Sequence, residues 1–340
     1  MWLVDVIKLV VPAAASTASA KVMLDWWLGV AARLGFVGRD MNKPGHPPVA
    51  EAGGVWVVLS SVFGILTYIA LDTYLSPGSN SIALLTVSTV LLLAGLIGFL
   101  DDMLGWKKGI SPLKRVLLTL PISLPLVSVE AGSSRVELPL LGVLDLGLAY
   151  PLLVVPVGVL GASNGFNMIA GYNGLEALQA AVLLSFASLL MLIRGQLDAF
   201  STILLVLAPV LLFYFSYNKY PAKMFPGNSF TYGMGALYAS LAIYWNFEKY
   251  AVASFALYLV ELALFIRGLL NGVYKENFGR VLSDGSLEPP YDKSYSLTHV
   301  AIKVVKRLKG KCREVDVVYF IVLLQFVVSA TSLLVVLYPL

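Results

Sequence analysis

Residues 81–102 read SIALLTVSTVLLLAGLIGFLDD, an apolar run of about 20 residues that ends in two adjacent aspartates. An apolar run of this length is what an α-helix needs to cross a bilayer. Two neighbouring carboxylates at a membrane boundary are costly unless a cation or another partner compensates them. A bound divalent metal would do so, and so would the basic residues that follow, Lys107, Lys108, Lys114 and Arg115. Considered alone, the pair also fits a solvated helix end.

The composition indicates a membrane protein. Of the 340 residues, 58% are hydrophobic and only 13% are charged, which is more apolar than a soluble domain requires. The net charge of +4 is small, and we expect no nucleic-acid partner. The single cysteine, Cys312, excludes a disulfide framework. The N-terminal run lacks a clear basic leader and is predicted to be a first span, not a cleaved signal.

Apolar runs of bilayer length recur along the whole chain. We predict an all-α polytopic membrane protein with one transmembrane domain, residues 1–340, and about ten spans. The spans are residues 4–26, 51–72, 82–100, 113–131, 149–166, 175–193, 199–216, 230–246, 250–270 and 316–338.

The basic residues orient these spans. The loops after the odd-numbered spans hold 20 of the 24 Lys and Arg residues. The positive-inside rule therefore makes those loops cytoplasmic, with both termini outside and Asp101 and Asp102 on the cytoplasmic face.

The last cytoplasmic loop, residues 271–315, is the only long polar segment. Residues 280–288 are predicted to form a β-hairpin that turns at Asp284-Gly285. Residues 295–309 are predicted to form an amphipathic helix whose apolar stripe and basic residues suit the inner membrane surface. On the opposite side, the alternating residues within 130–148 indicate a second short hairpin.

Four polar clusters fall on the predicted cytoplasmic face. They are residues 40–46 with 51–54, residues 98–102, residues 164–176, and residues 218–229. The third contains three amides, Asn164, Asn167 and Asn173, around a Gly-rich break between two spans. Amides at membrane depth need partners, and their oxygens suit Mg²⁺ while their N–H groups suit phosphate or a base. An Asn/Gly turn between helices is the simpler alternative.

Together the clusters supply carboxylates, amide oxygens, basic side chains and Gly-rich loops. This set is typical of a Mg²⁺–diphosphate site, where cations neutralise phosphoryl oxygens and the protein contributes little covalent chemistry. The membrane location indicates that one substrate is a lipid.

Several ordered motifs carry a resemblance to a known family. Residues 164–177 read NGFNMIAGYNGLEA, residues 99–102 read FLDD, and residues 40–43 read DMNK. With ten spans and a hairpin-bearing last loop, the chain resembles the polyprenyl-phosphate N-acetylhexosamine-1-phosphate transferases. It is most similar to their archaeal and eukaryotic branch, the UDP-N-acetylglucosamine–dolichyl-phosphate N-acetylglucosaminephosphotransferases.

The resemblance implies roles for individual residues. Asp101 and Asp102 would be the catalytic pair, and which of the two acts as the base is left open. Asn167 would be a ligand of the metal ion, either Mg²⁺ or Mn²⁺. The implied substrate-binding residues are Asp40, Lys43, Glu51, Lys114, Arg115, Asn164, Asn173, Lys275, Glu276 and Asn277.

Two departures from the family pattern affect these roles. Asn228 stands where the family usually has an aspartate that binds metal, and an Asn oxygen brings no charge to the ion. Lys275, Glu276 and Asn277 replace the Arg-His-Arg cluster that reads the sugar in the eukaryotic branch. The first departure motivates the alternative of an inactive member, and the second leaves the sugar open.

The implied activity is transfer of N-acetylglucosamine 1-phosphate from UDP-N-acetylglucosamine to a polyprenyl (dolichyl) phosphate, with release of UMP. This reaction would be the first step of lipid-linked oligosaccharide synthesis for N-glycosylation. Another UDP-N-acetylhexosamine, a covalent aspartyl-phosphate route, and a transporter of lipid or nucleotide-sugar without chemistry are the alternatives. The expected partners are the UDP-sugar, the lipid phosphate and membrane lipids, and a homodimer is left open.

Overall fold

The computed structural model describes residues 2–75, 81–104, 117–138 and 142–338. Helices dominate this part of the chain, and the strands form only short antiparallel pairs. The helices are α1 (Trp2–Val30), α2 (Gly54–Leu75), α3 (Ser81–Leu104), α5 (Leu124–Ser128), α6 (Val155–Met168), α7 (Leu175–Ile193), α8 (Leu197–Phe213), α9 (Gly227–Tyr244), α10 (Glu248–Ser254), α11 (Ala256–Leu270), α12 (Leu297–Lys309) and α13 (Glu314–Leu337), with shorter helical turns η1 (Leu120–Ser123), η2 (Tyr150–Val154) and η3 (Tyr214–Asn218).

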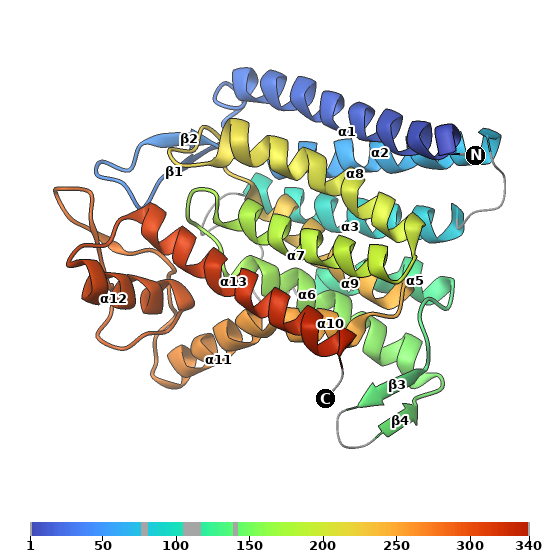
Figure 1. Cartoon of the computed structure of the whole chain (residues 1–340). Coiled ribbons are helices and arrows are strands. Elements are labelled where there is room, and N and C mark those ends of the chain that lie inside the picture. Colours follow the sequence, from blue (N-terminus) through green and yellow to red (C-terminus); the bar gives the residue numbers. More distant parts are fainter. Residues whose placement is uncertain (1, 76–80, 105–116, 139–141, 339–340) are drawn as a thin grey trace.

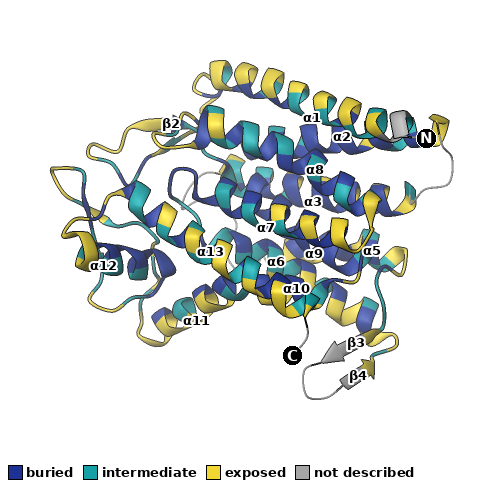
Figure 2. Ribbon diagram, in the orientation of Figure 1, coloured by how far each residue is buried: buried dark blue, intermediate teal, exposed yellow. Residues whose placement is uncertain are grey.

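The prediction of an all-α polytopic membrane protein is confirmed. Among the described residues, seven helices are long and apolar enough to cross a membrane, and α10 with α11 forms an eighth candidate that bends by 52°. Large apolar side chains on the outward faces of α1, α2, α3, α11 and α13 are exposed, as helices that face lipid require. Figure 2 shows this pattern most clearly along α1.

The count of ten spans stays a prediction. The two further predicted spans coincide with a shorter apolar helix, Leu117–Ser128, and with α9. Each lies where the sequence places an apolar run, but neither passes the same test of length and hydropathy in the described residues.

Helix α9 lies at the centre of the bundle. Every residue from 229 to 243 is buried, and the helix packs against α2, α3 and α6. Glycines permit the close approach: a Cβ at Gly98 of α3 would lie 2.3 Å from the Asn228 carbonyl oxygen, and one at Gly235 would lie 2.3 Å from the Ala162 carbonyl oxygen. Neighbouring helices shield α9 from lipid, so α9 can carry polar side chains that would be costly on a lipid-facing helix.

The described residues form three short β-hairpins outside the helical bundle. β3 (Arg135–Leu138) pairs with β4 (Gly142–Asp145), and β5 (Arg280–Val281) pairs with β6 (Leu287–Glu288), so both predicted hairpins are confirmed. The second turns through Gly285 at φ +75°, where a residue without a Cβ is favoured. A third hairpin, β1 (Val37–Arg39) with β2 (Pro48–Ala50), was not predicted and encloses residues 40–47.

The predicted amphipathic helix is present as α12, but its surroundings differ from the expectation. Ala301, Ile302 and Val305 are buried, and the helix packs against α11, α13 and β6. Leu308, an apolar residue near the end of this helix, is instead 77% exposed. The apolar face of α12 therefore packs on the protein and holds the last loop in place. This packing accounts for the apolar face without any contact with the inner membrane surface.

The elements that carry the polar clusters gather at one end of the bundle. In Figure 1, β1, β2 and α12 lie at the left, and β3 and β4 lie at the opposite end. The long helices run between these two ends, which brings the end of α3 and the start of α13 to the left-hand side. Segments far apart in the sequence therefore meet where the sequence predicts the site.

Candidate active site

The second of the paired aspartates binds the N-terminus of α9. Asp102 Oδ1 accepts a hydrogen bond from the backbone N–H of Asn228 at 2.7 Å, and Oδ2 accepts one from Ser229 at 3.1 Å. The first N–H groups of a helix have no partner within the helix, and a carboxylate there is stabilised by both hydrogen bonds and the helix dipole. A Cβ at Gly227, where φ is +73°, would lie 2.5 Å from Asp102 Oδ2, so glycine is required for this contact.

The first aspartate faces different partners. Asp101 is 2% exposed, and its Oδ2 accepts hydrogen bonds from the Asn228 side-chain amide at 2.9 Å and from the Tyr232 hydroxyl at 3.3 Å. Successive residues of a helix point about 100° apart, so the two carboxylates cannot share one set of partners. Asn228 nevertheless contacts both, through its side chain and through its backbone.

Helix α6 brings Asn167 to the same place. Thr231 of α9 donates its hydroxyl to Asn167 Oδ1 at 3.0 Å and to the Asn228 carbonyl at 3.3 Å. Asn167, Asn228 and Asp101 thus lie around the first turn of α9, on three different helices. Asn164, one turn earlier on α6, instead donates to Thr119 Oγ1 at 3.1 Å and to the Leu160 carbonyl at 3.0 Å.

A second buried network joins the first loop to the last helix. Lys43 forms an ion pair with Asp40 and donates to Asn173 Oδ1 at 2.7 Å, while the Asn173 amide donates to Asp40 Oδ2 at 3.1 Å. Glu314 Oε1 accepts from the Asn173 backbone N–H at 2.7 Å, and its Oε2 lies 3.5 Å from Lys43 Nζ. The structure therefore brings together three predicted substrate-binding residues.

Sequence reasoning missed Glu314. It is 3% exposed and stands at the start of α13, where an apolar run begins after a basic stretch. The signal that identified Asp101 and Asp102 was present here too: Glu314 is a carboxylate at a membrane boundary, where its charge needs a compensating partner. Lys43 provides that compensation here.

Glu51 lies between the β1–β2 hairpin and α2. Its backbone N–H donates to the Phe36 carbonyl at 3.0 Å, and its carbonyl accepts from Trp27 Nε1 at 2.7 Å. Burial raises the pKa of the Glu51 carboxyl. A Cβ at Gly38 would lie 2.1 Å from Glu51 Oε1, so this carboxyl rests against the hairpin backbone.

The predicted sugar-reading residues form a third network within the last loop. Lys275, 6% exposed, forms an ion pair with the buried Glu261 of α11 and donates to Asn277 Oδ1 at 2.6 Å. Asn277 donates to the carbonyls of Met168 at 3.0 Å and Ala170 at 2.9 Å, which ties the loop to the end of α6. Burial lowers the pKa of Lys275, and the Glu261 carboxylate opposes that shift. These side chains support the loop, and their role toward a sugar stays a prediction.

His299 holds the Glu276 backbone in this loop. Its Nδ1 accepts from the Tyr295 N–H at 3.2 Å, so Nε2 carries the proton that it donates to the Glu276 carbonyl at 2.8 Å. Burial lowers the pKa of His299 to about 4, because the charged imidazolium loses its hydration. The ring is therefore neutral at pH 7.

Two predicted phosphate-binding residues, Lys114 and Arg115, lie outside the described residues. The other predicted positions are described, and most of them form three separate networks at one end of the bundle: Asp101 and Asp102 with Asn167 and Asn228; Asp40 and Lys43 with Asn173; and Lys275 with Asn277. The side chains of Asn164 and Glu51 lie outside these networks, against Thr119 and the β1–β2 hairpin, and Glu276 contacts His299 through its backbone.

The first network suits a hard divalent cation by its chemistry. The oxygens near the first turn of α9 come from a carboxylate and two amides, donors that Mg²⁺ prefers. Within the described residues no group of three or more His, Cys, Asp or Glu side chains is arranged to hold a metal. An ion here would therefore depend on amide oxygens and on the phosphates of a substrate, as Mg²⁺ sites often do.

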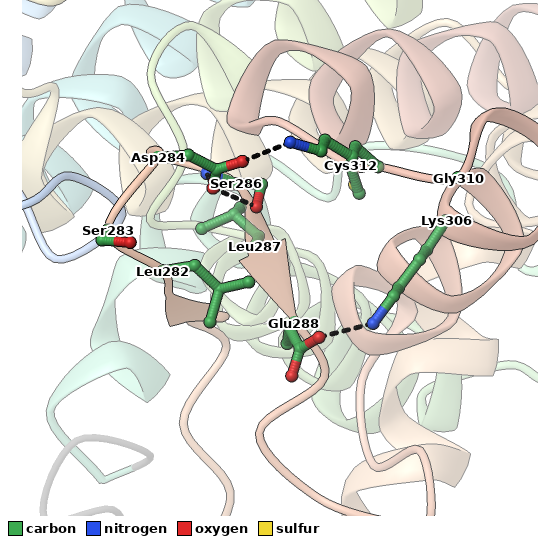
Figure 3. A pocket seen from close by; sticks show the side chains of 10 residues that line it. Leu282, Ser283, Asp284, Ser286, Leu287, Glu288, Lys306, Gly310 and Cys312 are labelled. Atoms are coloured by element: carbon green, nitrogen blue, oxygen red, sulfur yellow. Dashed lines mark hydrogen bonds and ion pairs between the residues drawn. The ribbon is translucent and has the colours of Figure 1, made fainter.

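A separate cavity of about 460 Å³ lies between the β5–β6 hairpin and the end of α12 (Figure 3). Asp284 pairs with Lys311 at 2.7 Å and Glu288 with Lys306 at 2.5 Å along its rim. Its lining shares no residue with the three networks, and its charged groups already pair with one another.

The fold and the buried polar networks define a class: an integral, multi-pass membrane protein with a polar site at one end of its helical bundle. Residues 82–246 match glycosyl transferase family 4, a segment that contains Asp101, Asp102, Asn167 and Asn228.

Relatives agree with this match. A protein of Sulfolobus acidocaldarius with the provisional name UDP-N-acetylglucosamine–dolichyl-phosphate N-acetylglucosaminephosphotransferase is 30% identical over 298 residues, 87% of this chain and 86% of that one. A protein of Saccharolobus solfataricus with the same provisional name is 30% identical over 86% of each chain. The phospho-N-acetylmuramoyl-pentapeptide-transferase of Petrotoga mobilis is 29% identical over 66% of this chain and 69% of that one. The chain belongs to glycosyl transferase family 4, and it is a membrane glycosyl-1-phosphate transferase.

Proposed function

We propose that this transferase moves N-acetylglucosamine 1-phosphate from UDP-N-acetylglucosamine to a polyprenyl phosphate of the dolichyl type and releases UMP. The observation that carries the proposal is the convergence of Asp101, Asn167 and Asn228 around the first turn of α9 at one end of a membrane bundle. The names of the two archaeal relatives support the choice of substrates. The reaction would begin the synthesis of a lipid-linked oligosaccharide for N-glycosylation.

In this reaction an oxygen of the lipid phosphate attacks the sugar-side phosphorus of the UDP-sugar. A new P–O bond forms to the lipid phosphate, and the bond from that phosphorus to the bridging oxygen breaks, so UMP leaves with the electron pair. Asp101 lies within the site to accept or orient a proton of the lipid phosphate. Asp102 holds the first turn of α9 in place, so that Asn228 presents its side chain beside Asp101.

Asn167, Asn228 and Asp101 are the residues that would hold a Mg²⁺ ion, and Mn²⁺ has the same ligand preference for oxygen. A bound divalent ion would neutralise phosphoryl oxygens while charge moves to the leaving UMP. Asn173, held in place by Asp40, Lys43 and Glu314, would bind the nucleotide. The reaction would take place on the cytoplasmic face of the membrane. A neutral Asn228 leaves Asp101 as the only charged ligand among these three.

The test is a reconstitution of the purified full chain. UDP-N-acetylglucosamine and dolichyl phosphate are incubated with Mg²⁺, and release of UMP and formation of the glycolipid diphosphate are both measured. We expect both products in equal amounts, and each formed at least about 100-fold more slowly with Asp101→Asn. Transport of the UDP-sugar without UMP release, or UMP release without a lipid product, would contradict the proposal.

The choice of sugar is tested in the same assay. UDP-N-acetylgalactosamine and UDP-glucose replace UDP-N-acetylglucosamine at equal concentration. We expect the highest turnover with UDP-N-acetylglucosamine. A higher turnover with another UDP-sugar would support the same class of reaction but would contradict UDP-N-acetylglucosamine as the substrate.

A further inference from the structure

A second cavity, of about 470 Å³, lies between α1 and the segment that follows α8. Its charged lining consists of Lys21 and Asp25 from α1 and of Lys219 and Lys223 from the other wall. None of the residues assigned to the three site networks lines it. It is at the same end of the bundle, because Lys43 Nζ lies 4.7 Å from the ring centroid of Tyr220, which does line the cavity.

The charges in this cavity do not cancel. Asp25 accepts a hydrogen bond from the Tyr217 hydroxyl at 2.6 Å and forms an ion pair with Lys21, so this carboxylate is already compensated. Within the described part of the chain neither Lys219 nor Lys223 forms a close ion pair, and both residues are exposed; Lys223 interacts with the Asp25 charge only as the weakest of the groups that lower the pKa of that carboxyl. The lining therefore carries two positive charges in excess of its negative ones.

Aromatic and apolar side chains form most of the remaining lining. Phe215 is 58% exposed and Tyr220 is 48% exposed, and Leu28 stands on the α1 side. Close to Leu28 along α1, Trp26 and Trp27 contact Trp56 of α2 at centroid distances of 5.3 and 5.4 Å, the first edge-to-face and the second tilted. Trp27 is buried and bonds to the Glu51 carbonyl, whereas Trp26 is 54% exposed, and exposed tryptophans are enriched at the depth of the lipid headgroups. The cavity thus combines lysine ammonium groups with an apolar rim, at the level of the membrane surface.

We propose that this cavity binds the phosphate headgroup of an anionic phospholipid. The phosphodiester carries one negative charge and accepts hydrogen bonds from ammonium groups, while the acyl chains follow the apolar rim. Basic pockets between transmembrane helices recognise anionic headgroups in this way. A zwitterionic lipid is disfavoured because its choline brings a positive charge toward Lys219 and Lys223. The occupant is a structural lipid, distinct from the substrate of the transferase.

The experiment compares three forms of the full chain in detergent. They are the wild type, the double variant Lys219→Gln/Lys223→Gln, and the control Arg33→Gln/Arg307→Gln, which removes two exposed charges from outside the cavity. Each is titrated with phosphatidylglycerol and with phosphatidylcholine, and bound lipid is counted by native mass spectrometry. The melting temperature is recorded at each step, so the readout does not depend on enzymatic activity.

We expect the wild type and the control to bind phosphatidylglycerol about tenfold or more tighter than phosphatidylcholine, since two lysines contribute to the headgroup contact. The double variant should bind both lipids alike and should lose the rise in melting temperature. No preference in the wild type, or the same loss in the control, would overturn the proposal.

Two further titrations distinguish a phospholipid headgroup from free phosphate and from the lipid substrate. Inorganic phosphate alone should not raise the melting temperature, and a rise equal to that with phosphatidylglycerol would show a site for soluble anions and overturn the lipid assignment. Dolichyl phosphate should not displace phosphatidylglycerol from this cavity. Displacement, together with a raised KM for dolichyl phosphate in the double variant, would show a substrate site and would equally overturn it.

Discussion

Asp102 Oδ1 accepts a hydrogen bond from the backbone N–H of Asn228 at 2.7 Å, across 126 positions of sequence. This contact fixes the end of α3 against the start of α9, and it turns the Asn228 amide toward Asp101. The paired aspartates therefore have different tasks. Asp102 holds the helix that builds the site, and Asp101 faces into it.

The first prediction separates these two tasks. Asp101→Asn should lower the rate of UMP release by at least about 100-fold, the range for loss of an acid–base group, with little change in melting temperature. Asp102→Asn should lower the rate as well, but it should also lower the free energy of unfolding by about 1 kcal/mol, because one charge-assisted contact to the helix N-terminus is lost. Rates within about tenfold of wild type for both variants would contradict the catalytic assignment.

Asn228→Asp tests the proposed metal site. A charged oxygen ligand binds a hard cation more tightly, so the variant should need less Mg²⁺ for half-maximal UMP release. In the absence of Mg²⁺ its melting temperature should fall, because a carboxylate would replace the amide that donates to Asp101 at 2.9 Å. The measurement is a Mg²⁺ titration of both activity and melting temperature. An equal or greater need for Mg²⁺, with no gain in activity, would assign position 228 to the helix terminus alone.

The last loop should influence which UDP-sugar is used. Among the three predicted residues, Glu276 is the one to replace: it is exposed, whereas replacing Lys275 or Asn277 would also break the contacts that hold the loop to Glu261 and to the end of α6. Glu276→Ala should change the ratio of turnover on UDP-N-acetylglucosamine to that on its epimer. An unchanged ratio would show that Glu276 does not read the sugar.

The ion pair beneath this loop should be structural. Lys275→Ala leaves the buried Glu261 carboxylate without its cation, so the free energy of unfolding should fall by about 3 kcal/mol or more. The matched control, Lys275→Gln/Glu261→Gln, replaces both charges with amides and should be less destabilised. Thermal unfolding of the two variants measures this difference, and equal losses would contradict it.

His299 should make the last loop sensitive to acid. Its pKa is about 4 in the folded chain and near 6.5 when unfolded, so the unfolded state binds a proton first as the pH falls. The contribution to stability is complete above pH 6.5, and it is lost as the pH falls toward 4, by up to about 3 kcal/mol. Hydrogen exchange of residues 275–300 between pH 7 and 4 should show this loss. His299→Asn keeps an acceptor near Nδ1 but does not titrate, and a pH dependence that survives in this variant would point to other groups.

Much of the fold was predictable from local sequence. The apolar runs predicted a helix in every span that the structure describes, and Asp284-Gly285 predicted the β5–β6 hairpin. Both signals are local, because backbone groups in a membrane are satisfied within one helix and a tight turn depends on its own residues. The β1–β2 hairpin was missed because its strands are three residues long and lack alternation.

The sequence by itself determined the class of protein, the end of the bundle that carries the polar groups, and most of the residue types in the site. Only the tertiary structure decided which groups meet: that Asp101 and Asp102 have different partners, that Glu314 supports Asn173, and that α12 packs on the protein. The physical reason is that apolar periodicity depends on neighbouring residues, whereas these contacts join positions more than 100 residues apart. Such contacts depend on how the helices pack, which no local pattern specifies.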